Sequence, residues 1–308
     1  MIVLIAVLSA LVATFLLYRL LRLVGKKTPT LTPATECHLG DGFISVVVPA
    51  YNEGEGIGLT LTTIDELAQD KSRIEIIVVD AGCKDNTMEV VNSLKTSVIL
   101  RSTTSSGGRG PAMNVGASAA RGDLLLFLHA DTVVPPAFDV TLREAFKDPG
   151  VLMTAFQFGV NRSLLRGKEP FALGLMERVT NIRTRRLHLP YGDQAFCLTA
   201  HKFREVGGFP DFVMMEDYEL VRRLRREELA GGGEIRILKK IALCAPRRWE
   251  MPGNNVFKNF AKNWIFVFLY SKMGYTPEQI FRLYYGKEPE NVAPSTAAAS
   301  RSKRRCST

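Results

Sequence analysis

The most informative stretch of the chain is LLLFLHADT, residues 124–132. Its first five residues, Leu124–Leu128, are apolar and predict a buried strand. His129 and Asp131 follow where this strand ends. A carboxylate beside a buried strand is costly unless a ligand or a cation engages it. The pattern therefore predicts a ligand site at this end of the strand, with Asp131 as a candidate metal ligand.

Similar apolar runs precede this stretch and alternate with helical patterns. Strands are predicted at 43–49 (FISVVVP), 74–79 and 97–100, and helices at 59–70, 85–94 and 111–120. Strands that alternate with helices imply an α/β fold with a mixed, mostly parallel sheet flanked by helices. Ligands bind such sheets at the C-terminal strand ends. Three polar features fall there: Tyr51-Asn52-Glu53, Asp80 and Asp131.

The second half of the chain is less regular. Strands are predicted at 151–160, 194–198 and 234–238, and helices at 171–186, 203–206, 215–229 and 255–270. The last helix is strongly apolar and aromatic, so it either lies in a membrane interface or packs on the domain. The expected organisation is a linker at 25–42, a main domain at 43–250, an amphipathic helical region at 251–286 and a disordered basic tail at 287–308.

Charge and cysteine content narrow the classes of function. The 308 residues carry a net charge of +9, with basic clusters at 19–27, 178–186, 222–226 and 301–305. Such clusters suit anionic lipids or anionic substrates, or they are solvated helix faces. None is interleaved with aromatics as in a nucleic-acid module, so nucleic acid is not an expected partner. The five cysteines lack CxxC spacing, which argues against a zinc site and a disulfide framework.

The N-terminus is an apolar run from Ile2 to Tyr18 that extends to about Val24. A helix that spans a membrane needs about 20 residues. The run lacks a preceding basic region and a clear cleavage site, so a retained transmembrane anchor over residues 1–24 is predicted. Basic residues follow the run, and the positive-inside rule then predicts a cytosolic main domain.

Five segments occur in the order known from the family 2 glycosyltransferases: VVVPAYNEGEGI, IIVVDAGCKDNT, GRGPAMNVGASAARGDLLLFLHADT, YGDQAFCLTAHKFREVGGFP and MEDYELVRRLRR. The chain resembles this family over about residues 43–250. Within the family it is similar to the small bacterial-type group with GRGxxMNxG, LHAD and a late RRW. The resemblance implies a GT-A, Rossmann-like fold and a nucleotide-diphosphate sugar as donor.

The resemblance also implies a divalent cation, Mg²⁺ or Mn²⁺, which neutralises the departing diphosphate. Asp131 matches the last residue of the family's Asp-x-Asp motif and is the expected metal ligand. One carboxylate suffices when phosphate and water supply the other ligands. His129 replaces the first Asp and is expected at the ribose or phosphate; alternatively, it is a half-buried residue without a role.

Other donor contacts are carried over residue by residue. Asp80 matches the position that faces the nucleobase, although Ala81 stands where a second Asp is common. Ala50–Tyr51 and Glu53 match the first nucleotide-facing loop, and Glu53 alternatively serves a local turn. Arg109 lies among glycines before a helix, where phosphate is attracted, and is a candidate phosphate contact.

The family's acidic pair before a helix is matched by Glu216 and Asp217. An inverting transferase needs a base that takes the acceptor proton, and Asp217 is the expected base with Glu216 as its neighbour. The alternative is that both acids stabilise the start of a helix. The expected acceptor contacts lie in YGDQ and in the late RRW: Asp193, Gln194, Arg248 and Trp249.

These motifs predict a membrane-anchored, metal-dependent, inverting enzyme that transfers a single sugar. The anchor and the basic clusters suggest a lipid-linked or membrane-associated acceptor. One rival is a non-catalytic nucleotide-sugar-binding or scaffolding membrane protein, favoured if Ala81 and His129 mark eroded chemistry. Another is a nucleotidyltransferase, which predicts a basic glycine-rich turn where this chain has the acidic YNEGEG.

Overall fold

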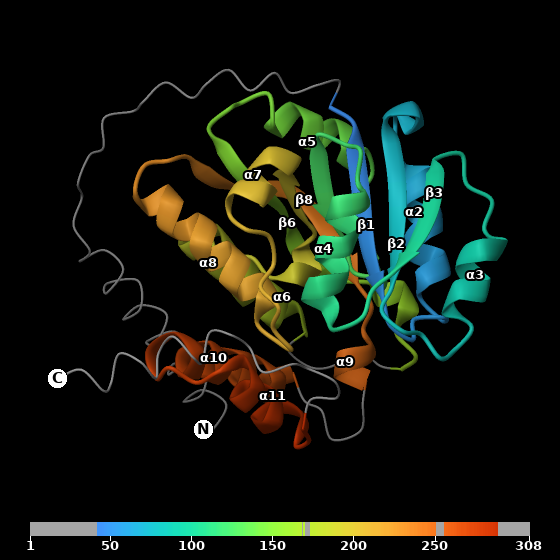
Figure 1. Ribbon diagram of the computed structural model, residues 1–308. Coiled ribbons are helices and arrows are strands. Elements are labelled where there is room, and N and C mark those ends of the chain that lie inside the picture. The colour runs from blue at the N-terminus through green and yellow to red at the C-terminus, as the bar shows by residue number, and fades with distance from the viewer. Residues whose placement is uncertain (1–41, 168, 170–172, 251–255, 289–308) are drawn as a thin grey trace.

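The computed structural model describes residues 42–167, 169, 173–250 and 256–288. Its centre is one eight-stranded sheet with helices on both faces (Figure 1). The strands are β1 Ile44–Ala50, β2 Ile74–Asp80, β3 Ile99–Thr104, β4 Leu124–Phe127, β5 Thr132–Val133, β6 Val151–Val160, β7 Phe196–Thr199 and β8 Glu234–Cys244.

The helices of the described residues fill the connections between strands and the C-terminal part. They are α2 Ile57–Leu67, α3 Thr87–Ser93, α4 Arg109–Ala119, α5 Phe138–Ala145, α6 Leu173–Leu187, α7 Ala200–Glu205, α8 Glu216–Leu229, α9 Arg247–Glu250, α10 Val256–Lys272 and α11 Pro277–Tyr285. Three short 3₁₀ turns accompany them: η1 Lys71–Arg73, η2 Arg162–Leu164 and η3 Gly192–Gln194.

The strand order is β3-β2-β1-β4-β7-β6-β8-β5. Pairs β1–β2, β2–β3, β1–β4 and β6–β8 are parallel, whereas β7 runs antiparallel to β4 and β6, and β5 to β8. The expected mixed, mostly parallel α/β sheet is therefore confirmed. Because β1, β2 and β4 are parallel neighbours, their C-terminal ends meet at one edge.

Alternating residues of β1 pack into two separate hydrophobic clusters, one on each face of the sheet. Val46 and Val48 belong to the cluster that also contains residues of α2, and Val47 belongs to the cluster that contains residues of α4. Helix α4 lies very close to the sheet because it carries Gly116 at the contact. A Cβ there would meet Val47 Cγ1 at 2.3 Å. The small-residue pattern of this helix thus sets how near its N-terminus comes to the strand ends.

The structure contains elements that periodicity did not predict. Strand β5 has only two residues, and helix α5 follows the double proline at 135–136. Ala137 precedes that helix in the left-handed region at φ 53°, a conformation that composition does not reveal. Strand β8 also continues beyond the predicted 234–238 to Cys244, where it pairs with β5.

The expected membrane anchor must be corrected. The prediction of a single-pass helix over residues 1–24, and of a membrane location based on it, is contradicted. Within 42–167, 169, 173–250 and 256–288, no helix has both the length and the apolar character that crossing a bilayer requires. Residues 1–24, most of the linker at 25–42, and residues 289–308 of the expected tail lie outside the described residues.

At the opposite end of the strands, the buried carboxylate of Glu75 holds several segments together. It accepts hydrogen bonds from Ser45 Oγ (2.6 Å), Arg121 N (2.8 Å) and Arg101 Nη2 (2.6 Å). Burial would raise the pKa of Glu75, but these donors outweigh burial and lower it below its ordinary value of 4.5.

Glu75→Gln is expected to lower the free energy of unfolding by about 2–3 kcal/mol at neutral pH, because charge-assisted hydrogen bonds are lost. The depressed pKa means that this stabilisation is present above the unfolded-state pKa and disappears as the pH falls through the folded-state value. Urea titrations should therefore show the two proteins converging below about pH 4.5. Glu144→Gln, at an exposed carboxylate of α5, is the control. A Glu75→Gln deficit that is independent of pH would contradict this account.

Candidate active site

The ends of β1 and β4 are joined by Arg247, the first residue of α9. Its guanidinium pairs with the Glu53 carboxylate and lies 3.2 Å from Asp131 Oδ2. Burial raises the pKa of Glu53, and the hydrogen bond from Arg247 opposes that rise. Two carboxylates from different strand ends therefore converge on one cation.

This convergence tests whether a divalent cation suits the site. Among the described residues, no group of three or more His, Cys, Asp or Glu side chains is placed to hold a metal ion. The site instead offers Asp131 and Glu53, hard oxygen ligands that already face a positive charge. Such a pair fits an ion that takes its remaining ligands from phosphate and water. With such an ion bound, the Arg247 guanidinium would be a second positive charge beside Asp131.

The end of β2 carries Asp80, which is engaged by the following turn. Its Oδ1 accepts hydrogen bonds from Gly82 N (2.9 Å) and Cys83 N (2.7 Å). Burial raises the pKa of Asp80, but these backbone donors outweigh it and the net pKa is lowered. Asp80 thus shapes the loop beside Tyr51, which is 55% exposed, whereas Ala50 is buried.

Helix α4 begins with Arg109, whose guanidinium pairs with Glu216. Glu216 is only 2% exposed, and Arg109 keeps 41% of its side chain accessible. Burial raises the pKa of Glu216, and Arg109 opposes the rise. Burial disfavours the charged form of Arg109, but Glu216 outweighs this and the net pKa of Arg109 is raised. The structure thus makes Glu216 the support of an exposed arginine at a helix N-terminus.

Asp217, the next residue of α8, is oriented by backbone groups. Its Oδ2 accepts a hydrogen bond from Gly192 N at 2.9 Å, and Oδ1 accepts one from Tyr218 N at 2.7 Å. His129 lies on the other side of Gly192. A Cβ built on Gly192 would come within 2.7 Å of His129 Nε2 and 3.2 Å of Asp217 Oδ2. The absence of a side chain at position 192 therefore lets these two functional groups approach each other.

The YGDQ segment forms the turn η3, and Gln194 holds it in place. The Gln194 side chain donates to Phe156 O (2.8 Å) and accepts from Tyr191 N (3.1 Å) and Thr184 Oγ1 (3.1 Å). Because these bonds occupy a fully buried amide, Gln194 supports the turn rather than offering a group to an acceptor. Asp193 lies on the same turn, one residue from Gly192.

The late RRW motif forms α9. Trp249 packs edge-on against Phe158, with ring centroids 6.1 Å apart, and joins a small apolar cluster with residues of β6 and α6. Trp249 is only partly buried in this cluster, and its contact with an acceptor stays a prediction. The side chain of Arg248 lies outside the described part. Arg247 and Gly192 belong to the RRW and YGDQ motifs but were not among the expected contact residues, and both prove central to the geometry.

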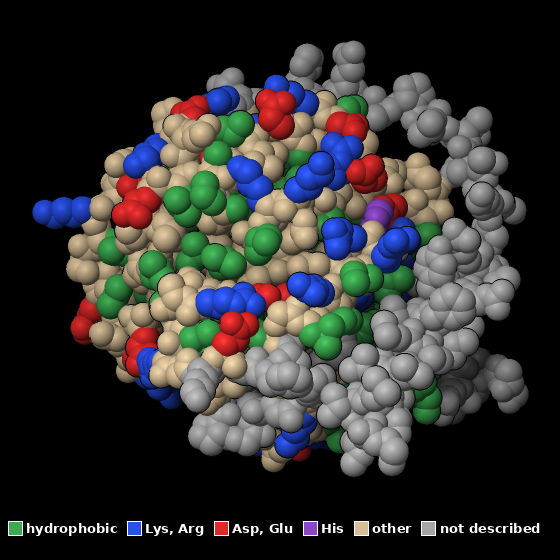
Figure 2. Space-filling model, turned by 180° about the vertical axis from the view of Figure 1, so that it is seen from behind, with side chains coloured by type: hydrophobic (Ala, Val, Ile, Leu, Met, Phe, Trp, Pro, Cys, Tyr) green, Lys and Arg blue, Asp and Glu red, His purple; other side chains and the backbone are tan. Residues whose placement is uncertain are grey.

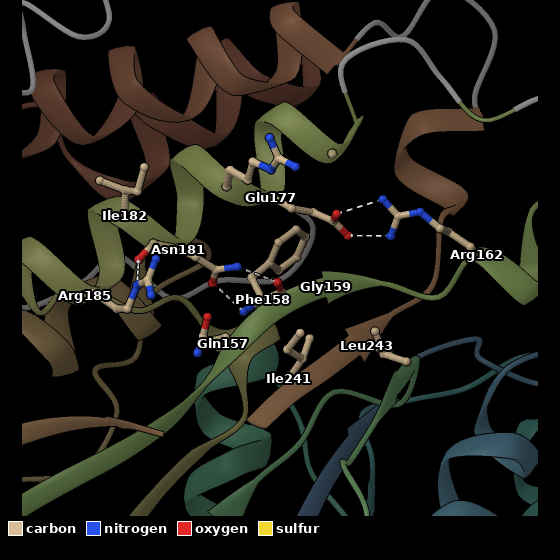
Figure 3. Close-up of a pocket in the computed structure, with 12 residues that line it drawn as sticks. Gln157, Phe158, Gly159, Arg162, Glu177, Asn181, Ile182, Arg185, Ile241 and Leu243 are labelled. Carbon is tan, nitrogen blue, oxygen red and sulfur yellow. Dashed lines mark hydrogen bonds and ion pairs between the residues drawn. The ribbon is translucent and has the colours of Figure 1, made fainter. Parts of the chain in front are cut away.

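A hollow of about 490 Å³ lies on another part of the molecule, between α6, β6 and β8 (Figure 3). Glu177 pairs with Arg162 at its rim, and Asn181 bonds to the Phe158 backbone at its base. None of the strand-end residues described above lines it. The hollow is therefore separate from the candidate active site.

The basic cluster at 222–226 is largely paired with acidic side chains of its own helix. On α8, Arg222 pairs with Glu219 and Arg225 with Glu228. Figure 2 likewise shows acidic and basic side chains interspersed over one face of the molecule. The cluster at 222–226 therefore behaves as a solvated helix face with local ion pairs. Arg183, in the cluster at 178–186, is an exception because it is buried.

Comparison with known proteins gives one family match. The family described as glycosyl transferase family 2 matches residues 45–206, which is more than half of the chain. The match contains β1, β2 and β4, together with Glu53, Asp80, Asp131 and the YGDQ turn. It ends before Glu216, Asp217 and Arg247. The parts of the site on α8 and α9 are therefore supported by the structure and not by the family match.

Individual relatives agree with this match. An uncharacterized glycosyltransferase of Mycobacterium tuberculosis is 28% identical over 186 residues, which cover 58% of this chain and 68% of the relative. A prophage bactoprenol glucosyl transferase homolog of Escherichia coli is 30% identical over 141 residues, covering 44% of this chain and 43% of that protein. This chain thus aligns with less than half of the latter relative.

A solved structure resembles the fold. The mannosyltransferase PcManGT of Pyrobaculum calidifontis, determined in complex with GDP-Man and Mn²⁺, superposes with a TM-score of 0.51 at 19% identity. The alignment covers 93% of this chain and 76% of that one. At this identity the likeness concerns the fold.

Gly192→Ala is expected to strain the contact between η3 and α8, since the new Cβ meets His129 and Asp217. We expect the free energy of unfolding to fall by about 1–3 kcal/mol, as for overpacked cores. The NMR signals of the His129 imidazole should shift as well. Gly167→Ala, where a Cβ has nothing within 4 Å, is the matched control and should leave both readouts unchanged. If both variants behave like the wild type, the close approach at Gly192 is not real.

Proposed function

Because this chain belongs to glycosyl transferase family 2, we propose that it transfers one sugar from a nucleotide-diphosphate sugar to an acceptor hydroxyl, with inversion at the sugar carbon. We also propose that it is one of the small bacterial-type members with LHAD and a late RRW.

The donor side of the proposed site is the positively charged part of the strand ends. Arg109 at the N-terminus of α4 and Arg247 on α9 are each partly accessible and each supported by a carboxylate. A diphosphate that bridges them would be held by two guanidiniums and by helix N–H groups. A divalent cation on Asp131, when bound, would add the charge that stabilises the departing diphosphate.

The acceptor side is the turn η3 with Asp217. As the acceptor oxygen forms its bond to the sugar carbon, its proton passes to an Asp217 oxygen. The bond between the sugar and the diphosphate breaks, and its electron pair leaves with the diphosphate. Gly192 N fixes the Asp217 carboxylate while this occurs.

One observation carries the proposal. Two partly accessible guanidiniums, Arg109 and Arg247, and a carboxylate oriented by backbone N–H groups, Asp217, belong to one group of strand-end and helix-start residues. This combination suits a reaction in which a carboxylate takes up a proton while guanidiniums stabilise a departing diphosphate.

The donor is tested by calorimetric titration of UDP-, GDP-, ADP- and dTDP-sugars and the free nucleoside diphosphates, with and without Mn²⁺ or Mg²⁺. We expect one nucleotide class to bind, with affinity that falls at least tenfold when the metal is omitted. Asp131→Asn should lose this metal dependence. Asp148→Asn, at an exposed site remote from the strand ends, should behave like the wild type. Absence of any nucleotide binding would favour the scaffold alternative.

A second test separates the roles of the acidic pair. Release of nucleoside diphosphate from the bound donor, with water or a hydroxyl acceptor as the second substrate, is expected to slow 10²–10⁴-fold in Asp217→Asn at unchanged donor affinity. Glu216→Gln should instead weaken donor binding, because Arg109 loses its partner. Equal effects of both variants on binding and on rate would refute this division of labour.

A further inference from the structure

Arg183 on α6 is a buried cation with unused hydrogen-bond donors. It is 6% exposed, and its Nε and Nη2 atoms are buried and form no hydrogen bond with any described residue. Arginine stays protonated in proteins, so its charge cannot be removed by deprotonation. Leaving such a charge without an anionic partner costs several kcal/mol, and an apolar side chain of similar volume would avoid that cost.

The helix on both sides of Arg183 is fixed to the sheet. Asn181 exchanges two hydrogen bonds with the Phe158 backbone, at 2.8 and 2.9 Å (Figure 3). Thr184 donates to Gln194 Oε1 at 3.1 Å. These anchors hold the intervening guanidinium in one place, so its free donors are preorganised rather than disordered.

Arg183 is also connected to the proposed acceptor turn. Its guanidinium carbon lies 3.7 Å from the centroid of the Tyr191 ring. Tyr191 immediately precedes Gly192, whose N–H orients Asp217. Stacking on a ring satisfies the face of a guanidinium, while the N–H groups on its buried edge remain unsatisfied and match the oxygens of a planar anion.

The charges around Tyr191 support this placement. Burial raises the pKa of the Tyr191 phenol; Arg183 opposes the rise, and Asp217 and Asp193 add to it. The Arg183 guanidinium and the Asp217 carboxylate thus both lie near the Tyr191 ring. An acceptor group bound to Arg183 would therefore lie close to the acceptor hydroxyl that loses its proton to Asp217.

We propose that Arg183 is the anion-binding residue of the acceptor subsite, and that the acceptor carries a phosphate or carboxylate group near the hydroxyl that receives the sugar. The inference rests on the proposed transferase function and specifies its acceptor class. Phosphate and carboxylate share the planar or forked oxygen pair that a guanidinium edge binds. Binding supplies the partner that the folded chain does not provide.

The test uses the full chain saturated with its nucleoside diphosphate and Mg²⁺, so that the donor subsite is filled. Inorganic phosphate and acetate are then titrated by calorimetry as separate probes. We expect one of them to bind, with affinity reduced at least tenfold in Arg183→Met and less in Arg183→Lys, which keeps the charge. Arg186→Met, at an exposed arginine of the same helix, should bind like the wild type. Preference for phosphate or for acetate identifies the class of acceptor anion.

Nucleoside diphosphate affinity is measured in the same samples. If it is intact while neither anion binds, or while Arg183→Met binds the anion like the wild type, the Arg183 proposal is overturned and the transferase proposal stands. If the nucleotide itself fails to bind, the proposed function fails first. Should Arg183→Met not fold, Arg183→Lys decides: unchanged anion affinity and unchanged preference between the probes contradict bidentate recognition by the guanidinium.

Discussion

The need to balance carboxylates that converge at one edge of the sheet governs the arrangement of this molecule. Parallel strands β1 and β4 bring Glu53 and Asp131 together, and like charges at close range repel. Arg247 offsets that repulsion by forming ion pairs with both carboxylates. The pairing of β8 with β5 and the hydrogen bond from Ala245 N to Asp131 O place the start of α9 beside the same strand ends.

A second pairing ties the other half of the site to the same edge. Arg109 at the start of α4 and Glu216 at the start of α8 form a pair in which only the arginine is accessible. This pairing places Asp217, the next residue, within reach of Gly192 N. The donor and acceptor sides are thus built from segments that lie far apart in sequence and are joined by ion pairs. A variant that breaks one pairing is expected to disturb both sides.

Much of the fold was predictable because its strands are short apolar runs with polar ends. The apolar composition of Val46–Val48 and Leu124–Leu128 predicts buried strands. Their alternation with helices predicts a largely parallel sheet. The two-residue strand β5 and helix α5 were not predictable, since pairing with β8 and a left-handed residue at Ala137 leave no periodic signal. The expected single-pass membrane anchor over residues 1–24 is not supported, since no helix of the described residues is long and apolar enough to cross a bilayer.

The site was predictable as a set of residue types but not as a set of contacts. Motifs located Asp131, Asp217 and the YGDQ turn. They did not show that the Gln194 side chain is buried and hydrogen-bonded within the protein. They also gave no reason to single out Arg183, because an arginine in a basic helix normally faces solvent. Only the packing of α6 against β6 and η3 reveals that it is buried and lacks a hydrogen-bond partner at two nitrogens.

Arg247 is central to the proposed site, because its guanidinium occupies the Glu53 and Asp131 carboxylates that a divalent cation would use. A crystal structure of the chain with Mn²⁺ and its nucleoside diphosphate, phased on the manganese anomalous signal, tests this most directly. The account predicts a manganese peak at Asp131, with the Arg247 guanidinium displaced from Asp131 toward the diphosphate. A manganese peak elsewhere, or a nucleotide bound while Arg247 still pairs with both Glu53 and Asp131, would contradict it.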